Sequence, residues 1–563
     1  MAASSRSLSY VVPAVPHSCG TRLRWAMAPP AFVPLATAAG ACALHGVGVR
    51  GQARHQCQLP GRLSFAAPAG VPRPARRPTA AAAATPRMAV ASSSDAPAAA
   101  SDSSAAGGVT LDRVVCKFGG SSLANAERLR EVTKLVKMQL DASAKPPIVV
   151  LSAMGPSTNE LLSAGDRALT EGVVDMTSIR NRAYEACEEL GLSTEDLVDP
   201  LLLNLDQLLL GVKFIKELSP RTMDYLVSFG ERLSVRIFAA HLRQNEGLPA
   251  RAVDAFDAGF RSNSTFTNAE LCDVTEAQVA SFFATSMPAD AVAIVTGFIA
   301  KDEDGNITTL GRGGSDLTAS TIGAALGVTE VQVWKDVDGI LSTDPRIVKA
   351  AVPVPSVMFE EAAEMAYFGA KVLHPIAMMP AMRANIPVRV KNSYNPSHPG
   401  TVIVRDRAVE ADNPVTAISV KRGVQLVDIV STRMLGAYGF LAEVFKLFAT
   451  HRVSVDMIAT SEVSVSLTLE AAKQDSRVMD ALAADLRQVA RVSFSSDHAI
   501  VSLVANVKRS SDVLARSMHV LNEAGIEVQM ISQGASKYNI SMIVADAKAT
   551  RAIELIHKAF FGV

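Results

Sequence analysis

The chain has 563 residues, of which 48% are apolar and 20% are charged, so it is long enough for about three or four domains of an ordinary globular protein. Its formal net charge is zero, but the first 94 residues contain ten Arg and no Asp, Glu or Lys. The rest therefore carries 45 basic against 55 acidic residues, and this negative balance disfavours binding to nucleic acid.

The first segment is typical of an organelle transit peptide, because it is rich in Arg, Ala and Ser and free of acidic residues. Its length resembles that of a chloroplast peptide, so we expect residues 1–91 to be a transit peptide and residues 92–110 to be a flexible linker. A disordered tail of similar composition is the alternative. The apolar stretch 25–49 is interrupted by prolines, so we expect no membrane span.

A short apolar run at 114–116 precedes the glycine run Lys117–Ser122, and apolar residues then recur at spacings of three and four over 123–140. This order predicts a strand at 114–118, a tight glycine turn and an amphipathic helix, with one of the two serines of the turn as its N-cap. Such a turn presents backbone N–H groups to a phosphate, and Lys117 adds a positive charge there. The turn lacks both standard nucleotide-binding spacings, so the pattern alone leaves phosphate binding open.

Further along, predicted strands alternate with predicted helices. The strands are Ile148–Ser152, Ala250–Asp254, Ala291–Gly297 and Val331–Trp334, and the helices cover 158–170, 177–190, 222–245 and 316–326. This α/β order predicts a mainly parallel sheet sandwiched by helices, over residues 111–408. Ligands bind such sheets at the carboxyl ends of strands, and both glycine-rich runs, Gly119–Ser122 and Gly311–Asp316, fall at or just after such ends.

From Gly423 onward the pattern changes to two copies of a βαββαβ unit, residues 423–496 and 497–563. The segment Ile526–Ile531 repeats the pattern of Val453–Ile458, which lies 73 residues earlier. The predicted strands of this part are Val424–Val430, Val453–Ile458, Val463–Leu469, Arg491–Ser495, Ala499–Val504, Ile526–Ile531 and Tyr538–Val544, and the predicted helices cover 439–451, 474–488 and 510–523.

Two motifs carry a family resemblance. The runs Lys117-Phe118-Gly119-Gly120-Ser121-Ser122 and Gly311-Arg312-Gly313-Gly314-Ser315-Asp316 are similar to the glycine-rich motifs of the aspartate kinases, a branch of the amino-acid kinase family. The likeness extends from about Val114 to the C-terminus and includes 150–155, 228–233, 334–340 and 370–375. The C-terminal copies resemble a tandem pair of ACT domains, which are ferredoxin-like modules that bind amino acids. The resemblance implies an amino-acid kinase fold followed by two ACT domains.

The resemblance implies transfer of the γ-phosphoryl group of ATP to the β-carboxylate of L-aspartate. The product, 4-phospho-L-aspartate, leads towards lysine, threonine and methionine. A carboxylate is ionised at neutral pH, so its attack needs no general base. The site instead needs cations and N–H donors that neutralise the moving phosphoryl group. We expect Mg²⁺ to bridge the ATP phosphates with few protein ligands, and Cys116, Cys187 and Cys272 match no metal-binding spacing.

The family likeness assigns the catalytic and substrate contacts. Lys117 is the implied stabiliser of the transferring phosphoryl group, and Asp316 would orient Lys117 or position the metal, or cap the helix that it opens. The implied contacts of aspartate are Glu231 with the amino group and Arg312 with the α-carboxylate, where a planar guanidinium suits bidentate binding. Thr158 resembles a further substrate contact.

The likeness also assigns a nucleotide-binding set. The implied ATP-binding residues are Lys117, Gly119, Gly120, Ser121, Lys335, Asp336, Leu341, Arg346, Lys371 and Val372. Taken singly, the charged members of this set are also typical of solvated loops. His374 precedes a proline, so we expect it to shape a turn rather than to act in catalysis.

The first ACT copy resembles the effector-binding segments of lysine-inhibited aspartate kinases. The implied effector contacts are Met434, Ala437, Gly439, Phe440, Leu441, Ser454, Val455, Asp456, Thr460 and Ser461. Asp456 would pair with a cationic end of the effector. The resemblance favours lysine over threonine and leaves open S-adenosylmethionine acting together with lysine, as in plant-type enzymes. The alternative is that the ACT domains only assemble a homodimer or tetramer.

The resulting expectation is a plastid, stromal enzyme that is feedback-inhibited by lysine. We expect it to be monofunctional, because the chain ends at Val563 directly after the second ACT copy. One alternative is a different amino-acid kinase, such as an acetylglutamate or glutamate 5-kinase, which the full set of motifs disfavours. Another is a catalytically silent amino-acid sensor, which the intact Lys117 and Asp316 disfavour.

Overall fold

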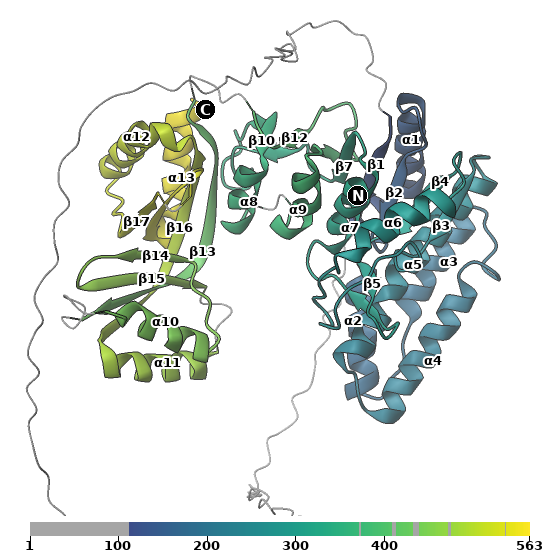
Figure 1. Cartoon of the computed structure of the whole chain (residues 1–563), viewed down its shortest axis with the longest axis horizontal. Coiled ribbons are helices and arrows are strands. Elements are labelled where there is room, and N and C mark those ends of the chain that lie inside the picture. The colour runs from purple at the N-terminus through teal and green to yellow at the C-terminus, as the bar shows by residue number, and fades with distance from the viewer. Residues whose placement is uncertain are drawn as a thin grey trace, which may run out of the picture. The chain divides into compact units, whose positions relative to one another are not determined.

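The computed structural model describes residues 112–370, 373–407, 413–431, 438–470, 475–534 and 536–562. These residues build an α/β region around an eight-stranded sheet and a C-terminal α+β region around a six-stranded sheet (Figure 1). Within them, no helix combines the length and the apolar character that crossing a bilayer requires.

The eight-stranded sheet is mainly parallel. It consists of β1 Val114–Phe118, β2 Ile148–Leu151, β3 Ala250–Val253, β4 Val292–Thr296, β7 Glu330–Lys335, β10 Ser356–Met358, β11 Val388–Asn392 and β12 Thr401–Val404. Their order is β10-β12-β11-β7-β1-β2-β4-β3, and only β11 and β12 pair antiparallel. Strands β1, β2 and β4 are buried along their whole length, as in a parallel sheet covered on both faces. The predicted fold class is confirmed.

Strand β1 is the point where the order of the sheet reverses. It lies between β2 and β7, so the chain first builds the sheet on one side of β1 and later returns to the other side. Such a reversal opens a crevice at the carboxyl ends of the strands. Phe118, the last residue of β1, pairs in register with Leu151 and Trp334, so the loops after the three strands leave the sheet at one edge.

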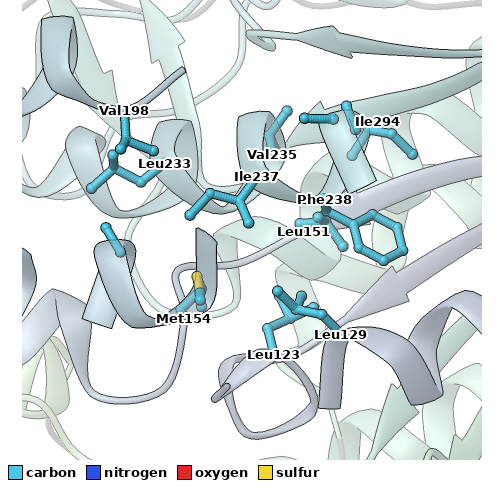
Figure 2. Close-up of a cluster of buried hydrophobic side chains, with 14 of the residues drawn as sticks. Leu123, Leu129, Leu151, Met154, Val198, Leu233, Val235, Ile237, Phe238 and Ile294 are labelled. Carbon is cyan, nitrogen blue, oxygen red and sulfur yellow. The ribbon is translucent and has the colours of Figure 1, made fainter. Parts of the chain in front are cut away.

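Helices cover both faces of this sheet. They are α1 Ala126–Ala142, α2 Ser157–Thr170, α3 Thr177–Glu189, α4 Asp199–Ile215, α5 Pro220–Gln244, α6 Val274–Thr285, α7 Gly314–Leu326, α8 Phe359–Tyr367 and α9 Pro375–Ala384, with small hairpins β5 Ile299–Lys301 to β6 Ile307–Thr309 and β8 Ile340–Leu341 to β9 Pro353–Val354. Cys116 and Phe118 face a core shared with α1–α5, whereas Val115 faces a second core with α7–α9. Figure 2 shows Leu151 and Phe238 within the first core.

The helix after the first glycine run begins later than predicted. Gly120–Leu123 form a 3-10 turn, and α1 starts at Ala126 with Asn125 as its N-cap. The side chain of Asn125 accepts a hydrogen bond from the backbone N–H of Arg128 at 3.0 Å, whereas the buried hydroxyl of Ser122 is engaged with that of Ser393 at 2.8 Å. The prediction that a serine of the turn caps this helix is therefore wrong, because an asparagine in extended conformation takes that role.

The first core provides a stability prediction. Phe238 of α5 is completely buried, whereas Phe214 of α4 is 77% exposed. Replacing Phe238 with alanine should lower the free energy of unfolding by about 3–5 kcal/mol, through lost transfer energy and a residual cavity. The matched variant Phe214→Ala should change it by less than about 0.5 kcal/mol. Urea unfolding of both variants is the measurement, and equal losses would contradict the assigned core.

The C-terminal region is one antiparallel sheet in the order β14-β15-β13-β16-β18-β17. Its elements are β13 Val415–Val430, α10 Phe440–Thr450, β14 Met457–Thr460, β15 Ser464–Glu470, α11 Ser476–Val489, β16 Arg491–Ala505, η4 Val507–Arg509, α12 Ser510–Glu523, β17 Met530–Gln533, β18 Asn539–Ala545 and α13 Asp546–Phe561. Figure 1 shows α10 with α11 and α12 with α13 as two helix pairs, and each pair packs into its own apolar core.

Several strand predictions in this region need correction. β14 begins at Met457 and β17 at Met530, each four residues later than predicted. β13 begins at Val415 rather than Val424, and the two strands predicted over 491–504 are one continuous β16. The pairing of β13 with β16 shifts register between Lys421 and Val424 and again before Leu426. Gly423 and Asp497 have positive φ at this point. The turn-like sequence therefore forms local irregularities in a continuous ladder and does not end the strands.

Candidate active site

The two glycine-rich runs meet at the carboxyl end of β1. Lys117 lies near the end of β1, and Asp316 lies in the first turn of α7. The Nζ atom of Lys117 is 2.7 Å from Oδ1 of Asp316, and both side chains are only about one-tenth exposed. Gly313, with φ of 79°, lets the chain turn into α7. The structure therefore brings together the two predicted catalytic residues as a buried ion pair.

A second lysine, Lys335, interacts electrostatically with the Asp316 carboxylate. Burial opposes the ionisation of Asp316, but the positive charges of Lys117 and Lys335 outweigh it, so the pKa of Asp316 lies below its ordinary value. Burial lowers the pKa of Lys335, an effect that the carboxylate of Asp316 opposes and the charge of Lys117 reinforces. Lys117 and Lys335 thus place two positive charges at the crevice, which suits an anionic phosphate.

The glycine turn after β1 is tightly packed. A Cβ atom on Gly120 would lie 2.9 Å from the carbonyl oxygen of Ala153 and 3.0 Å from that of Gly155. The backbone N–H of Gly155 donates to the carbonyl of Gly120 at 3.0 Å, which joins the loops after β1 and β2. A Cβ on Gly119 would lie 3.9 Å from the Nζ atom of Lys117. Ser121, the fourth member of the predicted nucleotide set here, is exposed.

Glu231 is a buried carboxyl group with one free oxygen. It lies in α5 and is 3% exposed, and its Oε1 accepts a hydrogen bond from the N–H of Ala153 at 3.2 Å. Its Oε2 is buried and has no hydrogen-bond partner within the described residues. Burial raises the pKa of Glu231 to about 8, although the Ala153 N–H and the charge of Lys117 oppose the shift. An unpaired buried oxygen of this kind fits a cationic ligand group.

The other predicted aspartate contacts lie on the segments that follow β2 and β6. Thr158 is half-buried in the first turn of α2, which follows β2. Arg312 is exposed between Gly311 and Gly313, which both have positive φ. No ion pair of Arg312 is present in the part of the chain that the structure describes. A hydrogen bond of 3.0 Å between the hydroxyls of Ser152 and Ser315 joins the two loops.

A cavity of about 540 Å³ begins at the end of β7, a size that suits a nucleoside. It is lined by Lys335, Asp336, Leu341 and Arg346 of the predicted nucleotide set. The exposed guanidinium of Arg346 pairs with the neighbouring Asp344, which fixes it locally. The predicted contacts Lys371 and Val372 lie outside the described residues, although their neighbours Gly369 and Ala370 line the cavity.

Sequence reasoning missed two parts of the site. Residues 418–420 of β13 line the nucleoside-sized cavity, although they belong to the C-terminal sheet. His374 is the N-cap residue of α9, as a turn-shaping residue would be, but it also lies against the second glycine motif. A Cβ on Gly313 would be 2.7 Å from the Cβ of His374. Its buried Nδ1 has no hydrogen-bond partner among the described residues, a free polar atom that sequence spacing could not reveal.

The side chains that commonly bind metal ions are dispersed across the described ranges. No group of three His, Cys, Asp or Glu residues there is placed to hold a metal ion. Burial raises the pKa of the Cys116 thiol to about 12 and that of Cys187 to about 11, so these thiols are protonated at neutral pH.

The predicted effector residues surround the first helix of the C-terminal region and the strand after it. Gly439 is the N-cap of α10, Phe440 is buried at its start, and Leu441 is 40% exposed. Met434 and Ala437 lie outside the described residues.

The remaining predicted effector residues flank β14. Ser454 and Val455 precede the strand, and Thr460 ends it. The hydroxyl of Ser461 lies 2.7 Å from that of Ser464. Asp456 is not free, because its carboxylate is already ion-paired with a lysine of β13 at 2.8 Å.

Comparison with known proteins places this arrangement in a family. Residues 112–392 match the model of the amino acid kinase family, and residues 427–486 and 501–560 match that of the ACT domain. Over 461 residues the chain is 50% identical to aspartokinase 1, chloroplastic, of Arabidopsis thaliana, which covers 79% of this chain and 80% of that protein. The chain belongs to the aspartokinase family. As an aspartokinase-family member it is a kinase, and the predicted tandem ACT domains are confirmed.

Two solved structures of one Escherichia coli aspartokinase resemble the chain. Aspartokinase III in complex with aspartate and ADP, in the R-state, has a TM-score of 0.67 and 33% identity, and the match covers 80% of this chain and all of that one. The same enzyme in complex with lysine and aspartate, in the T-state, has a TM-score of 0.64 and 33% identity, over 80% and 99% of the two chains. The chain therefore shares the fold of this relative.

Proposed function

We propose that the chain transfers the γ-phosphoryl group of ATP to the β-carboxylate of L-aspartate, giving 4-phospho-L-aspartate and ADP. The observation that carries this proposal is the buried pair Lys117–Asp316 at the reversal point of the sheet, beside Lys335 and next to a nucleoside-sized cavity. Family membership supports it, since the E. coli relative was solved with aspartate and ADP.

The proposed chemistry rests on positioning and charge rather than on proton abstraction. Lys117 is held by Asp316 and stabilises the negative charge that spreads over the transferring phosphoryl group. The backbone N–H groups of Gly119 and Gly120 contact the phosphates, and Lys335 holds the nucleotide side of the crevice. Mg²⁺ enters as part of the MgATP substrate and keeps several waters, so it needs few protein ligands.

Aspartate binds through its α-ammonium and α-carboxylate in this proposal, which leaves the β-carboxylate free to attack. The unpartnered Oε2 of Glu231 receives the ammonium. Arg312, exposed on its glycine-flanked loop, takes the α-carboxylate with its planar guanidinium. Thr158 at the start of α2 contributes a further contact.

The raised pKa of Glu231 leads to a pH prediction. Below pH 8 most Glu231 carboxyl groups are protonated in the free enzyme, and the ammonium of aspartate needs the carboxylate. The KM for aspartate should therefore fall as pH rises from 6.5 towards 8, by up to about tenfold per pH unit, and level off above the pKa. Steady-state kinetics of the wild type and of Glu231→Gln provide the measurement. A wild-type KM that does not change with pH would contradict the prediction.

We propose that lysine inhibits the enzyme through the first ACT domain. Asp456 has the charge needed to pair with a lysine ammonium, and an E. coli relative was solved with lysine in a T-state. Inhibition requires lysine to bind an inactive state more tightly than the active one. A homodimer or tetramer assembled through the ACT domains, and S-adenosylmethionine as an additional effector, belong to the same proposal.

We also propose that the protein works in the chloroplast stroma. Residues 1–91 have the composition of a transit peptide, with 92–110 as linker, and the Arabidopsis relative is named chloroplastic. Import of a fluorescent fusion of residues 1–110 into isolated chloroplasts would test this location.

Acceptor specificity tests the proposed reaction against its alternatives. ADP release would be measured with aspartate, glutamate and N-acetylglutamate as acceptors, in the presence of MgATP. Of the three acceptors, only aspartate should support ADP release. Turnover with glutamate or N-acetylglutamate instead would favour another amino-acid kinase activity, and binding of aspartate without turnover would favour a silent sensor.

A further inference from the structure

Strand β13 carries part of the nucleoside-sized cavity. Ile418, Ser419 and Val420 line that cavity together with residues around the end of β7. The N–H of Ile418 donates to the carbonyl of Ser342 at 2.7 Å, next to the cavity residue Leu341. The hydroxyl of Ser419 is buried and has no hydrogen-bond partner within the described residues. A strand of the C-terminal six-stranded sheet, which we call the regulatory sheet, therefore forms a wall of the site that we assign to the nucleotide.

The next residue of the same strand, Lys421, sits in a cage for an ammonium group. Its Nζ lies 2.8 Å from Oδ2 of Asp456 and 3.2 Å from Oε2 of Glu470, and its side chain is only 14% exposed. The ring of Tyr367 lies 5.4 Å from the same Nζ, within the range of a cation–π contact. The Tyr367 hydroxyl also donates to Oδ1 of Asp456 at 3.3 Å.

β13 and α8 each contribute residues to both the cage and the cavity. Along β13, Ser419 and Lys421 are two residues apart and therefore point to the same face of the strand. Along α8, Tyr367 of the cage is two residues from Met365, which lines the cavity. β13 pairs with β16 without a register shift from Ala417 to Lys421, the stretch that contains Ser419. A displacement at Lys421 is therefore carried into the cavity wall rather than absorbed locally.

We propose that Lys421 is a positioning residue that links Asp456 to the nucleotide cavity through β13. The inference rests on the proposed function, because it identifies how the regulatory sheet acts on the proposed nucleotide site. In the ion-paired state, Asp456 holds Lys421 and thereby the wall at Ser419. An effector ammonium that takes over Asp456 releases Lys421, and the wall loses its fixed position. By linkage, nucleotide binding and effector binding then oppose each other equally.

ADP binding to the full chain, measured by calorimetry without any effector, tests this link. The variants are Lys421→Gln, Asp456→Asn and the double variant. The matched control is Arg422→Gln, which removes the same charge from the next residue of β13, where the side chain pairs with Asp546 instead. Each single variant should weaken ADP binding about fivefold, the range expected for residues along a coupling route, and the double variant should be no weaker than either one.

Three results of these binding measurements would overturn the proposal. The first is an ADP affinity of the single variants that equals that of Arg422→Gln. The second is a pair of single-variant losses that simply add in the double variant. The third is unchanged ADP binding by the double variant. This result decides the question if an unpaired charge prevents either single variant from folding, because the double variant carries neither charge.

Lysine is added in a separate arm, which keeps the two proposals distinguishable. If lysine weakens ADP binding to the wild type, that effect should shrink by about fivefold or more in Lys421→Gln while persisting in Arg422→Gln; its persistence in Lys421→Gln would overturn the link. If lysine does not change ADP binding to the wild type, only the assignment of lysine as the effector is overturned. The ADP-binding measurements made without effector would still decide the role of Lys421.

Discussion

Replacing Lys117 with alanine is expected to lower kcat about a thousandfold, with a much smaller change in the KM for ATP. The ammonium is buried at the end of β1 and held 2.7 Å from Asp316, so it acts on charge that develops mainly in the transition state. Loss of one preorganised donor costs about a hundred- to a thousandfold in comparable sites, and loss of a cation at a transferring phosphoryl group costs more. Initial rates at saturating ATP and aspartate are the measurement.

The control for this variant is Lys134→Ala. Lys134 lies on α1, is 70% exposed in its side chain and pairs only with the exposed Glu131 among the described residues, so its removal should leave kcat within about twofold of the wild type. Thermal unfolding of both variants checks that Lys117→Ala remains folded, because Asp316 loses a buried partner. A folded Lys117→Ala enzyme that retains more than about a tenth of wild-type kcat would contradict the assigned role.

Replacing Glu231 with glutamine should raise the KM for aspartate about a hundredfold while the KM for ATP stays within about twofold. The substitution keeps the shape of a 3%-exposed side chain but removes the negative charge that is proposed to meet the α-ammonium. Truncating one partner of a buried charge pair has an effect of this order. The two KM values, measured in the same assays, separate a substrate contact from general damage to the fold.

The matched control is Glu188→Gln on α3, where the side chain is exposed and the change should leave both KM values unaltered. A Glu231→Gln enzyme with wild-type KM for aspartate would remove Glu231 from the substrate site. A parallel rise in both KM values would point to a packing role, since Gly230 and Glu231 hold α5 against Ala153.

The central part of the fold could be predicted from local patterns. The predicted strand at 114–118 matches β1 residue for residue, and α2, α3, α5 and α7 begin within about two residues of their predicted starts. These elements carry strong signals, because buried parallel strands are continuous apolar runs and the helices have clear periodicity. α4 has Leu on most sides, as in Leu201–Leu205, and therefore lacks the polar face that would have revealed it.

Site residues could be predicted only where they lie within a sequence motif. The motifs pointed to Lys117 and Asp316, and the structure places them 2.7 Å apart. No local pattern predicts that Ser419 lines the nucleotide cavity, since that contact depends on how β13 extends beyond the repeat. Two strands were predicted on either side of Asp497, because the polar stretch there has the sequence of a turn. In the structure Asp497 has positive φ, but the pairing continues through it.

Product identification tests the central claim most directly. The full chain would be incubated with MgATP, L-aspartate and hydroxylamine, and the hydroxamate and the ADP would be quantified in the same reaction by mass spectrometry. The proposed function predicts equal amounts of ADP and of aspartate β-hydroxamate, formed from 4-phospho-L-aspartate and dependent on Lys117. A folded protein that binds ATP and aspartate but forms neither product would contradict it and would favour an amino-acid sensor.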